Sequence, residues 1–256
     1  RRFPFLTNAL EAPAMANDRV DPLAVRRARF AQRQAADGKG VVETFDGLEP
    51  GGTGPTNRHG NPKLPPGQRA VPNWPILDLG VHPRVAPEAW ELVIDGLVAR
   101  PQRLSFAALS ALEPAEFEAD FHCVTTWSKM DMRFGGVLFS TLMDLAGPLP
   151  EARFVETEGY DVDPSSGEPY TTNLSLEDAL SPDVLLVHTV DGAPLAREHG
   201  GPVRMVTPRL YAWKGAKWIR RITLLAKDSP GFWERRGYSM TGYPWFDDRY
   251  RRRGDL

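Results

Sequence analysis

The sequence predicts an α+β fold, in which one domain of mixed β-sheets and short helices follows an irregular amino-terminal region. Strand-like alternations recur between residues 90 and 226, and short helical stretches fall between them. The regular strand–helix alternation of a doubly wound sheet is absent. Because the composition changes at about residue 72, we divide the chain into an amino-terminal region, 1–72, and a folded domain, 73–256.

The amino-terminal region combines a leader, a basic helix and a Gly/Pro-rich arm. The opening "RRFPFLTNALEAPAMA" has twin arginines, but polar residues stand where an export signal needs a longer apolar core. We therefore interpret it as a disordered leader, with Met15 as a candidate start. Asp21 as N-cap, Pro22 in the first turn and Gly38 beyond the end predict a cationic helix. Residues 38–72 are too rich in Gly and Pro for repeating structure, and such arms are usually functional.

Two stretches are typical of half-buried strands that end at an Asp-Gly turn. In "AWELVIDGLV", the side chains of Trp90, Leu92 and Ile94 share one face of the expected strand. "VLLVHTVDGAPL" (184–195) repeats this arrangement. Each pattern predicts a strand that enters a hairpin or a short loop. Further strands are expected at 153–157, 184–190, 202–206 and 218–226.

Capping residues predict short helices between the strands. "SFAALSAL" begins at Ser105, "STLMDLAG" ends at Gly147, and "SLEDAL" has Ser175 as its N-cap. In the carboxyl-terminal tail, a helix-start pattern at Ser229 is followed by a stop at Gly237. We interpret the aromatic residues of this tail as packing residues that hold the chain end to the domain: Phe232, Trp233, Tyr238, Trp245 and Tyr250.

Composition argues against several functional classes. A net charge of −2 is unfavourable for non-specific nucleic-acid binding, which needs a basic face. The single cysteine, Cys123, rules out an intramolecular disulfide and a zinc site built on cysteine pairs. No apolar run approaches the ~18 residues of a membrane span. The glycine-rich dinucleotide fingerprint and the phosphate loop of nucleotide hydrolases do not occur in the sequence.

Cys123 lies in a loop-like, aromatic-flanked stretch, "FHCVTTWSK", and its residue type leaves three interpretations open. A lone cysteine can be a buried small hydrophobe, a nucleophile or a metal ligand. His122 is a poor proton partner, because adjacent residues on an extended segment point to opposite faces. A cysteine-dependent hydrolase would need His188 or His199 to be brought in by the fold.

The stretch "EHGGPVRMVTPRLYAWKGAKWIRRI" (198–222) concentrates groups that could bind an anion. His199 precedes a Gly-Gly-Pro turn, Arg204 offers a fork of donors, and Lys214 and Lys217 flank two small residues. Small residues let a ligand approach backbone amides closely. The alternative is that the charges are solvated and the tryptophans of the stretch fill the core. The spacing does not identify the anion.

Four motifs in this order, "HCVTTWS", "EHGGPVR", "YAWKGAKWIRRI" and "GFWERRGY", resemble the sulfite oxidase fold of molybdenum–pterin oxidoreductases. The similarity runs from about Pro72 to Tyr250 and is greatest to compact members related to the molybdenum catalytic subunit that reduces methionine sulfoxide. It implies a molybdopterin cofactor with Cys123 as the metal ligand and catalytic residue. It also implies a set of cofactor-binding residues: Asn73, Thr157, His199, Arg204, Gly215, Ala216 and Lys217.

The resemblance also implies a function. We expect oxygen-atom transfer to or from a small substrate, which could be an S-oxide, an N-oxide or an oxyanion. The arginines that follow the ligand cysteine in animal and plant sulfite oxidases are replaced here by uncharged residues, 124–127, so sulfite is disfavoured. We expect a separate electron-transfer protein, a monomer and a cytoplasmic location, with a Gly/Pro-rich arm that wraps the cofactor. A thiol hydrolase and a non-catalytic anion-binding module on the same fold are the alternatives.

Overall fold

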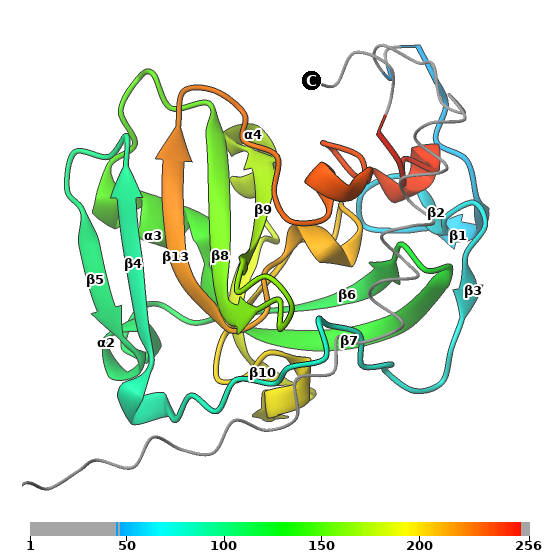
Figure 1. The fold of residues 1–256 in the computed structure, drawn as a ribbon. Helices are drawn as coiled ribbons and strands as arrows, with labels where there is room; N and C mark the ends of the chain where they lie inside the picture. The colour runs from blue at the N-terminus through cyan, green and yellow to red at the C-terminus, as the bar shows by residue number, and fades with distance from the viewer. Residues whose placement is uncertain (1–44, 46, 252–256) are drawn as a thin grey trace, which may run out of the picture.

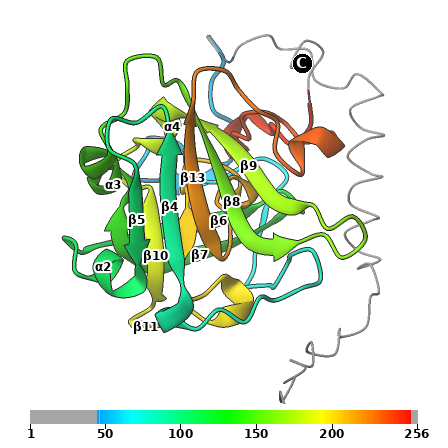
Figure 2. The same ribbon diagram turned by 60° about the vertical axis from the view of Figure 1, so that its left-hand side comes forward.

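The computed structural model describes residue 45 and residues 47–251. The expected leader and the expected helix that starts at Asp21 lie outside the described residues. Two β-sheets form the body of the protein, and Figure 2 shows one of them in front of β7 and β10 of the other. The prediction of mixed sheets with short helices is confirmed.

Among the described residues, the first sheet has six strands in the order β11-β10-β7-β3, with β12 paired to β10 and β6 paired to β7. Its bounds are β3 Arg69–Ala70, β6 Ala115–Cys123, β7 Trp127–Leu138, β10 Leu185–Val190, β11 Ala193–Pro194 and β12 Arg204–Val206. The β6–β7 hairpin runs across the lower part of Figure 1, at an angle to the strands of the second sheet. This hairpin carries the cysteine at its turn.

In the part of the chain that the structure describes, the second sheet has five strands in the order β5-β4-β13-β8-β9, and β4 and β13 are parallel. Its bounds are β4 Glu91–Gly96, β5 Gln102–Ser105, β8 Phe154–Val162, β9 Pro169–Ser175 and β13 Ile219–Leu225. The alternation expected in β4 is confirmed, because Trp90, Leu92 and Ile94 are all buried. The indole of Trp90 donates to the carbonyl of Ile219 at 2.9 Å, which joins the start of β4 to the start of β13.

The predicted helix ends are confirmed in α2 (Phe106–Ser110), α3 (Phe139–Ala146) and α4 (Leu176–Ala179). The Ser105 hydroxyl accepts from an amide of the first turn of α2, as does that of Ser175 in α4. Helix α3 ends at Gly147, which has a φ of 65°. In the tail, the expected helix is only a single 3₁₀ turn, η4 (Glu234–Arg236).

The Gly/Pro-rich arm contains repeating structure, so the expectation of an irregular segment was wrong. Strands β1 (Thr53–Thr56) and β2 (Pro62–Leu64) form an antiparallel hairpin, and β3 joins the first sheet beside β7. The Trp245 indole donates to the Pro62 carbonyl at 2.6 Å. Short strands tolerate Gly and Pro at a sheet edge, where part of the hydrogen-bonding ladder is open.

Strands β6, β7 and β9 were not predicted. The turn between β6 and β7 is very tight: Cys123 pairs with Trp127, and Thr126 between them has a φ of 77°. Cys123 is therefore the last residue of a strand and not part of a loop. Among the helices of the described residues, none is long and apolar enough to cross a membrane.

Candidate active site

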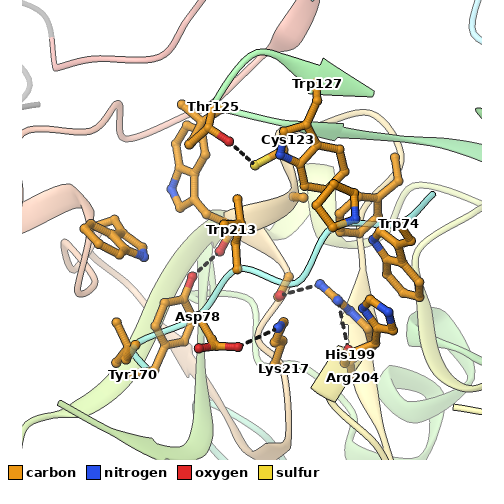
Figure 3. A pocket seen from close by; sticks show the side chains of 18 of the residues that line it. Trp74, Asp78, Cys123, Thr125, Trp127, Tyr170, His199, Arg204, Trp213 and Lys217 are labelled. Atoms are coloured by element: carbon orange, nitrogen blue, oxygen red, sulfur yellow. Dashed lines mark hydrogen bonds and ion pairs between the residues drawn. The ribbon is translucent and has the colours of Figure 1, made fainter. Parts of the chain in front are cut away.

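A cavity of about 100 Å³ lies beside the β6–β7 turn. Five of the predicted site residues line it: Cys123, His199, Arg204, Gly215 and Lys217. Figure 3 shows the labelled side chains that face this space. The fold thus brings together residues from separate stretches of the sequence.

The position of Cys123 is fixed by contacts from outside its own hairpin. Its carbonyl accepts a hydrogen bond from the side-chain amide of Gln68 at 3.0 Å. The next carbonyl, that of Val124, accepts from the buried guanidinium of Arg249. The Cys123 sulfur lies 3.2 Å from the Thr125 hydroxyl. The thiol therefore meets the cavity at a point set by both the arm and the tail of the chain.

His122 faces away from the cavity, as the alternation of a strand predicts. Its Nδ1 lies 2.8 Å from the hydroxyl of Ser128, and burial lowers its pKa to about 3. His188 lies on β10 with its ring 5.9 Å from that of Phe106, and it lines a different surface cavity. Of the two histidines proposed as partners of Cys123, the fold thus brings only His199 to the same cavity.

The ring of His199 stacks flat on Trp74, with centroids 3.9 Å apart and an interplanar angle of 2°. His199 ends the 3₁₀ turn η2 (Arg197–His199), and Gly200 follows with a φ of 106°. Burial, with Lys217 and Arg204 nearby, lowers the His199 pKa to about 4. The imidazole is therefore neutral near pH 7.

Arg204 is a buried cation whose side chain donates to backbone carbonyls. Its guanidinium reaches the carbonyls of His199 at 3.0 Å and Gly215 at 3.4 Å, and it lies 5.0 Å over the ring of Phe121. Burial lowers its pKa to about 10, so the side chain remains charged at neutral pH. A desolvated cation held by carbonyl oxygens is well suited to an anionic ligand.

Lys217 and two aspartates share the same part of the cavity. The Lys217 ammonium lies 3.4 Å from an Asp78 carboxylate oxygen and donates to the Glu198 carbonyl at 2.8 Å. Burial and Arg204 lower the Lys217 pKa to about 8. Asp161 is 3% exposed, burial raises its pKa to about 7, and its Oδ1 has no hydrogen-bond partner. We call Arg204 and Lys217 the charged end of the cavity, and His199 and Asp161 lie beside it.

The other predicted cofactor residues are placed differently. A Cβ on Gly215 would lie 2.3 Å from the Met205 carbonyl oxygen, so chain packing requires this glycine. Ala216 is fully buried outside the cavity lining, and its carbonyl accepts from the Met205 amide. Thr157 is buried on β8, outside the lining, with an unpartnered hydroxyl. Asn73 is exposed, and the adjacent Trp74 lines the cavity instead.

Lys214 does not belong to the anion site, which corrects the expectation from the sequence. Its ammonium is fully buried and donates to the Glu234 carboxylate at 2.7 Å. It also donates to both oxygens of Asn173 and to the Met240 carbonyl. The Gly/Pro-rich arm also differs from expectation, because the described part that precedes Trp74 does not line the cavity.

Several aromatic residues of the cavity were missed. The sequence left core packing as one interpretation of Trp213 and assigned Trp233 and Tyr238 to packing of the tail, yet all three line the same space as Cys123. Trp127 and Tyr170 also line it. Aromatic residue type did predict burial correctly: each of these aromatic residues is at most 8% exposed. The aromatic positions in "YAWKGAKW" and "GFWERRGY" were the sequence signal that could have indicated an aromatic lining of the cavity.

The chain is similar to known oxidoreductases. The family described as "Oxidoreductase molybdopterin binding domain" matches residues 79–233. The "Uncharacterized oxidoreductase YuiH" of Bacillus subtilis (strain 168) is 40% identical over 189 residues, which are 73% of this chain and 92% of that protein. The "Protein-methionine-sulfoxide reductase catalytic subunit MsrP" of Gluconobacter oxydans (strain 621H) is 35% identical over 161 residues, 58% of this chain and 51% of the relative.

Two further similarities concern larger proteins. The "Sulfite oxidase" of Gallus gallus is 32% identical over 180 residues, 61% of this chain and 39% of the relative. The chain thus spans about half or less of the length of the two named enzymes that it matches. The crystal structure of the sulfane dehydrogenase SoxCD from Paracoccus pantotrophus matches with a TM-score of 0.52 and 24% identity, over 59% of this chain and 42% of the other. This structural match supports the fold.

Proposed function

This chain belongs to the oxidoreductase family with a molybdopterin-binding domain, and from that premise we propose that it transfers an oxygen atom to or from a small substrate. It is a molybdopterin-dependent enzyme. The observation that carries the proposal is the shared cavity, in which one thiol faces two largely buried cations and one unpartnered carboxyl oxygen. We assign Cys123 as the protein ligand of the molybdenum, because thiolate is a soft ligand.

The charged end fits the phosphate of a pterin cofactor. A terminal phosphate carries about −2 charge, and its oxygens accept strong hydrogen bonds from cationic donors. Arg204 and Lys217 are desolvated and line the same cavity, so each would regain favourable electrostatics on binding an anion. We propose both as phosphate-binding residues, with the neutral ring of His199 held beside them by its stack on Trp74.

Asp161 supplies a complementary fit that the sequence motifs did not predict. A pterin ring presents N–H donors along one edge, and such an edge needs acceptors inside the protein. Asp161 lines the cavity, and its buried Oδ1 has no hydrogen-bond partner. Asp78 already pairs with Lys217, which makes it less available for the ring. Of Gly215, Ala216, Thr157 and Asn73, only Gly215 lines the cavity, so the other three stay predictions.

When bound, the cofactor supplies a two-electron redox centre that can give or accept an oxygen atom. The chain contributes a thiolate at a fixed point, a binding site for the anionic end and aromatic walls that exclude water. Reduction of an S-oxide consumes two electrons and two protons and releases water, whereas oxidation of a substrate returns the electrons. We assign this exchange to a separate electron-transfer protein, and the relative MsrP, named as a catalytic subunit, supports that division.

The test is metal and pterin analysis of purified protein, followed by dye-linked turnover on S-oxides, N-oxides and sulfite. We expect about one molybdenum per chain, and loss of at least ~100-fold in turnover in Cys123→Ala. Phe117→Leu, on β6 outside the cavity, is the matched control and should keep both metal and turnover. Full activity in Cys123→Ala would contradict the proposal.

A further inference from the structure

Three aromatic side chains form a continuous surface in the cavity: Trp213, Trp233 and Tyr238. The ring of Tyr238 lies 5.2 Å from that of Trp213 and 5.3 Å from that of Trp233, in the latter case stacked at 21°. All three residues line the space that Cys123 faces. We call this surface the aromatic wall. The oxygen-atom transfer proposed above uses aromatic walls only to exclude water, and it leaves substrate recognition unassigned.

The aromatic wall is held by a buried polar network directly behind it. Trp213 is followed by Lys214, and Trp233 is followed by Glu234; this pair forms a fully buried salt bridge. The Trp213 indole also donates to the Glu234 carboxylate at 2.9 Å. The Tyr170 hydroxyl donates to the Trp213 carbonyl. Two distant segments of the chain are thereby fixed to each other, and so are the rings that they present to the cavity.

Charge is distributed unevenly around the cavity. In Figure 3, Cys123, Thr125 and Trp127 lie along one side, and the labelled charged residues lie along the opposite side. The residues that follow the thiol, Val124 and Thr125, are uncharged. Among the described residues that line the cavity, Arg204 and Lys217 supply the lysine and arginine charge. Both belong to the charged end, where the proposed phosphate site uses them.

An anionic substrate and a neutral substrate should therefore bind beside Cys123 with different affinities. A sulfite-like dianion would lose its hydration beside Cys123. Both cations of the cavity, Arg204 and Lys217, are already used by the proposed phosphate site, so no cation would compensate for this loss, which is costly. A neutral molecule with an apolar substituent would bury that group against aromatic faces, and sulfur makes favourable contacts with aromatic rings. The wall thus favours the second kind of substrate.

We propose that the aromatic wall is the substrate-binding surface and that it selects a neutral S-oxide carrying an apolar substituent. This inference rests on the proposed function. In the reaction the S–O bond breaks, sulfur gains two electrons, and the oxygen leaves as water with two protons. An external one-electron donor, which is a reduced viologen dye in the assay, supplies the electrons in two steps.

The first arm of the experiment measures binding without turnover, on the molybdenum-loaded protein. Methyl p-tolyl sulfone is a neutral, redox-inert relative of an aryl sulfoxide, and sulfate is a redox-inert relative of sulfite. Because several tryptophans line the cavity beside Cys123, the sulfone should change the tryptophan fluorescence in a saturable way. It should also inhibit sulfoxide reduction competitively, at concentrations at least ~10-fold below those needed with sulfate.

The second arm compares substrates and variants. We expect kcat/KM for methyl p-tolyl sulfoxide to exceed that for dimethyl sulfoxide by ~10- to 100-fold. Trp233→Leu should remove most of this preference, because it should lower kcat/KM for methyl p-tolyl sulfoxide more than kcat/KM for dimethyl sulfoxide. Trp233→Phe should restore much of the preference, which a merely structural defect would not do. Phe117→Leu, which exchanges an aromatic side chain outside the cavity, should keep the wild-type preference.

The outcomes separate this inference from the proposed function. Protein that contains molybdenum and pterin but binds sulfate as tightly as the sulfone would overturn the inference and leave the function standing. An unchanged substrate preference in Trp233→Leu would also overturn it. Protein purified without molybdenum and pterin from a host that makes the cofactor would overturn the function, and the inference with it.

Discussion

The charged end and the aromatic wall of the cavity both include residues of the stretch 198–222, but they differ in how the polar groups next to them are satisfied. Lys214, behind the wall, donates to four acceptors, and its charge is matched by Glu234. Lys217, three residues later, has a pKa lowered by burial and lies near the unpartnered oxygen of Asp161. The first lysine completes the fold, whereas the second, although paired with Asp78, faces the cavity.

The largest expected effect concerns Arg204. Replacement by Met removes a buried cation, which typically costs ~2–5 kcal/mol of binding energy to an anionic partner. We expect Arg204→Met to lose at least ~30-fold in cofactor affinity and to purify with little molybdenum. Arg220→Met is the matched control, because Arg220 is partly exposed and pairs with Glu158 on β8. Equal molybdenum content in the two variants would place the cofactor elsewhere.

Substitutions of Lys214 and Lys217 should affect different properties: the first should lower the free energy of unfolding, and the second should lower cofactor binding. Removing Lys214 leaves Glu234 buried and uncompensated, so Lys214→Met should lower the free energy of unfolding by ~3–5 kcal/mol in urea. Lys217→Met should lower it far less, because the ammonium is already disfavoured by burial, but should reduce the pterin content. The comparison fails if Lys217→Met destabilises the cofactor-free protein as much as Lys214→Met does.

Asp161 should make the stability of the cofactor-free protein depend on pH. Its raised pKa means that the folded state holds a proton between about pH 4 and about pH 7 that the unfolded chain has released. This contribution to stability is complete at low pH and is lost as the pH rises towards about 7. Asp161→Asn should therefore raise Tm at pH 8 by at least ~4 °C and change it little at pH 4.

In the cofactor-loaded protein the same substitution should act in the opposite direction. An amide oxygen is a weaker acceptor than a carboxylate oxygen, so Asp161→Asn should retain less pterin than wild type. Fluorescence of the extracted pterin measures the retained fraction. A variant that is more stable without cofactor and also retains full pterin would exclude Asp161 from the cofactor site.

The smallest expected effect concerns the hydroxyl beside the thiol. Thr125→Val keeps the size of the side chain and removes the group that lies 3.2 Å from the Cys123 sulfur. The loss of one hydrogen bond, ~1 kcal/mol, should change turnover by less than ~10-fold and leave the metal content unchanged. Loss of metal in this variant would show that Thr125 supports the ligand itself.

The sequence could predict much of this site because its motifs resemble those of a known family, whereas the residues alone left solvated charges as an alternative. The resemblance implied one cofactor site for Cys123, His199, Arg204 and Lys217, and the fold brings all four to one cavity. The placement of Lys214 in the anion site was wrong, because the sequence shows that a lysine is present but does not show which acceptors surround it. Its partners lie 20 to 41 residues away along the chain.

The aromatic wall could not be predicted on the same grounds. Trp213, Trp233 and Tyr238 are largely buried, and a buried aromatic side chain that packs in a core has the same sequence signature as one that lines a cavity. The prediction of an irregular Gly/Pro-rich arm was wrong for a related reason. Gly and Pro argue against regular structure locally, but β3 of the arm pairs with β7, which is a long-range contact that local composition does not reveal. In both cases tertiary context decided what local composition left open.

The most direct test of the account is the sulfur coordination of the bound molybdenum, measured by X-ray absorption on the wild type and on Cys123→Ser. In the proposed site, the Cys123 thiolate binds the molybdenum, and the charged end binds the phosphate of the pterin. The variant should therefore retain pterin and show one fewer sulfur neighbour at the molybdenum. An unchanged number of sulfur neighbours in Cys123→Ser would contradict the assignment of Cys123 as the metal ligand.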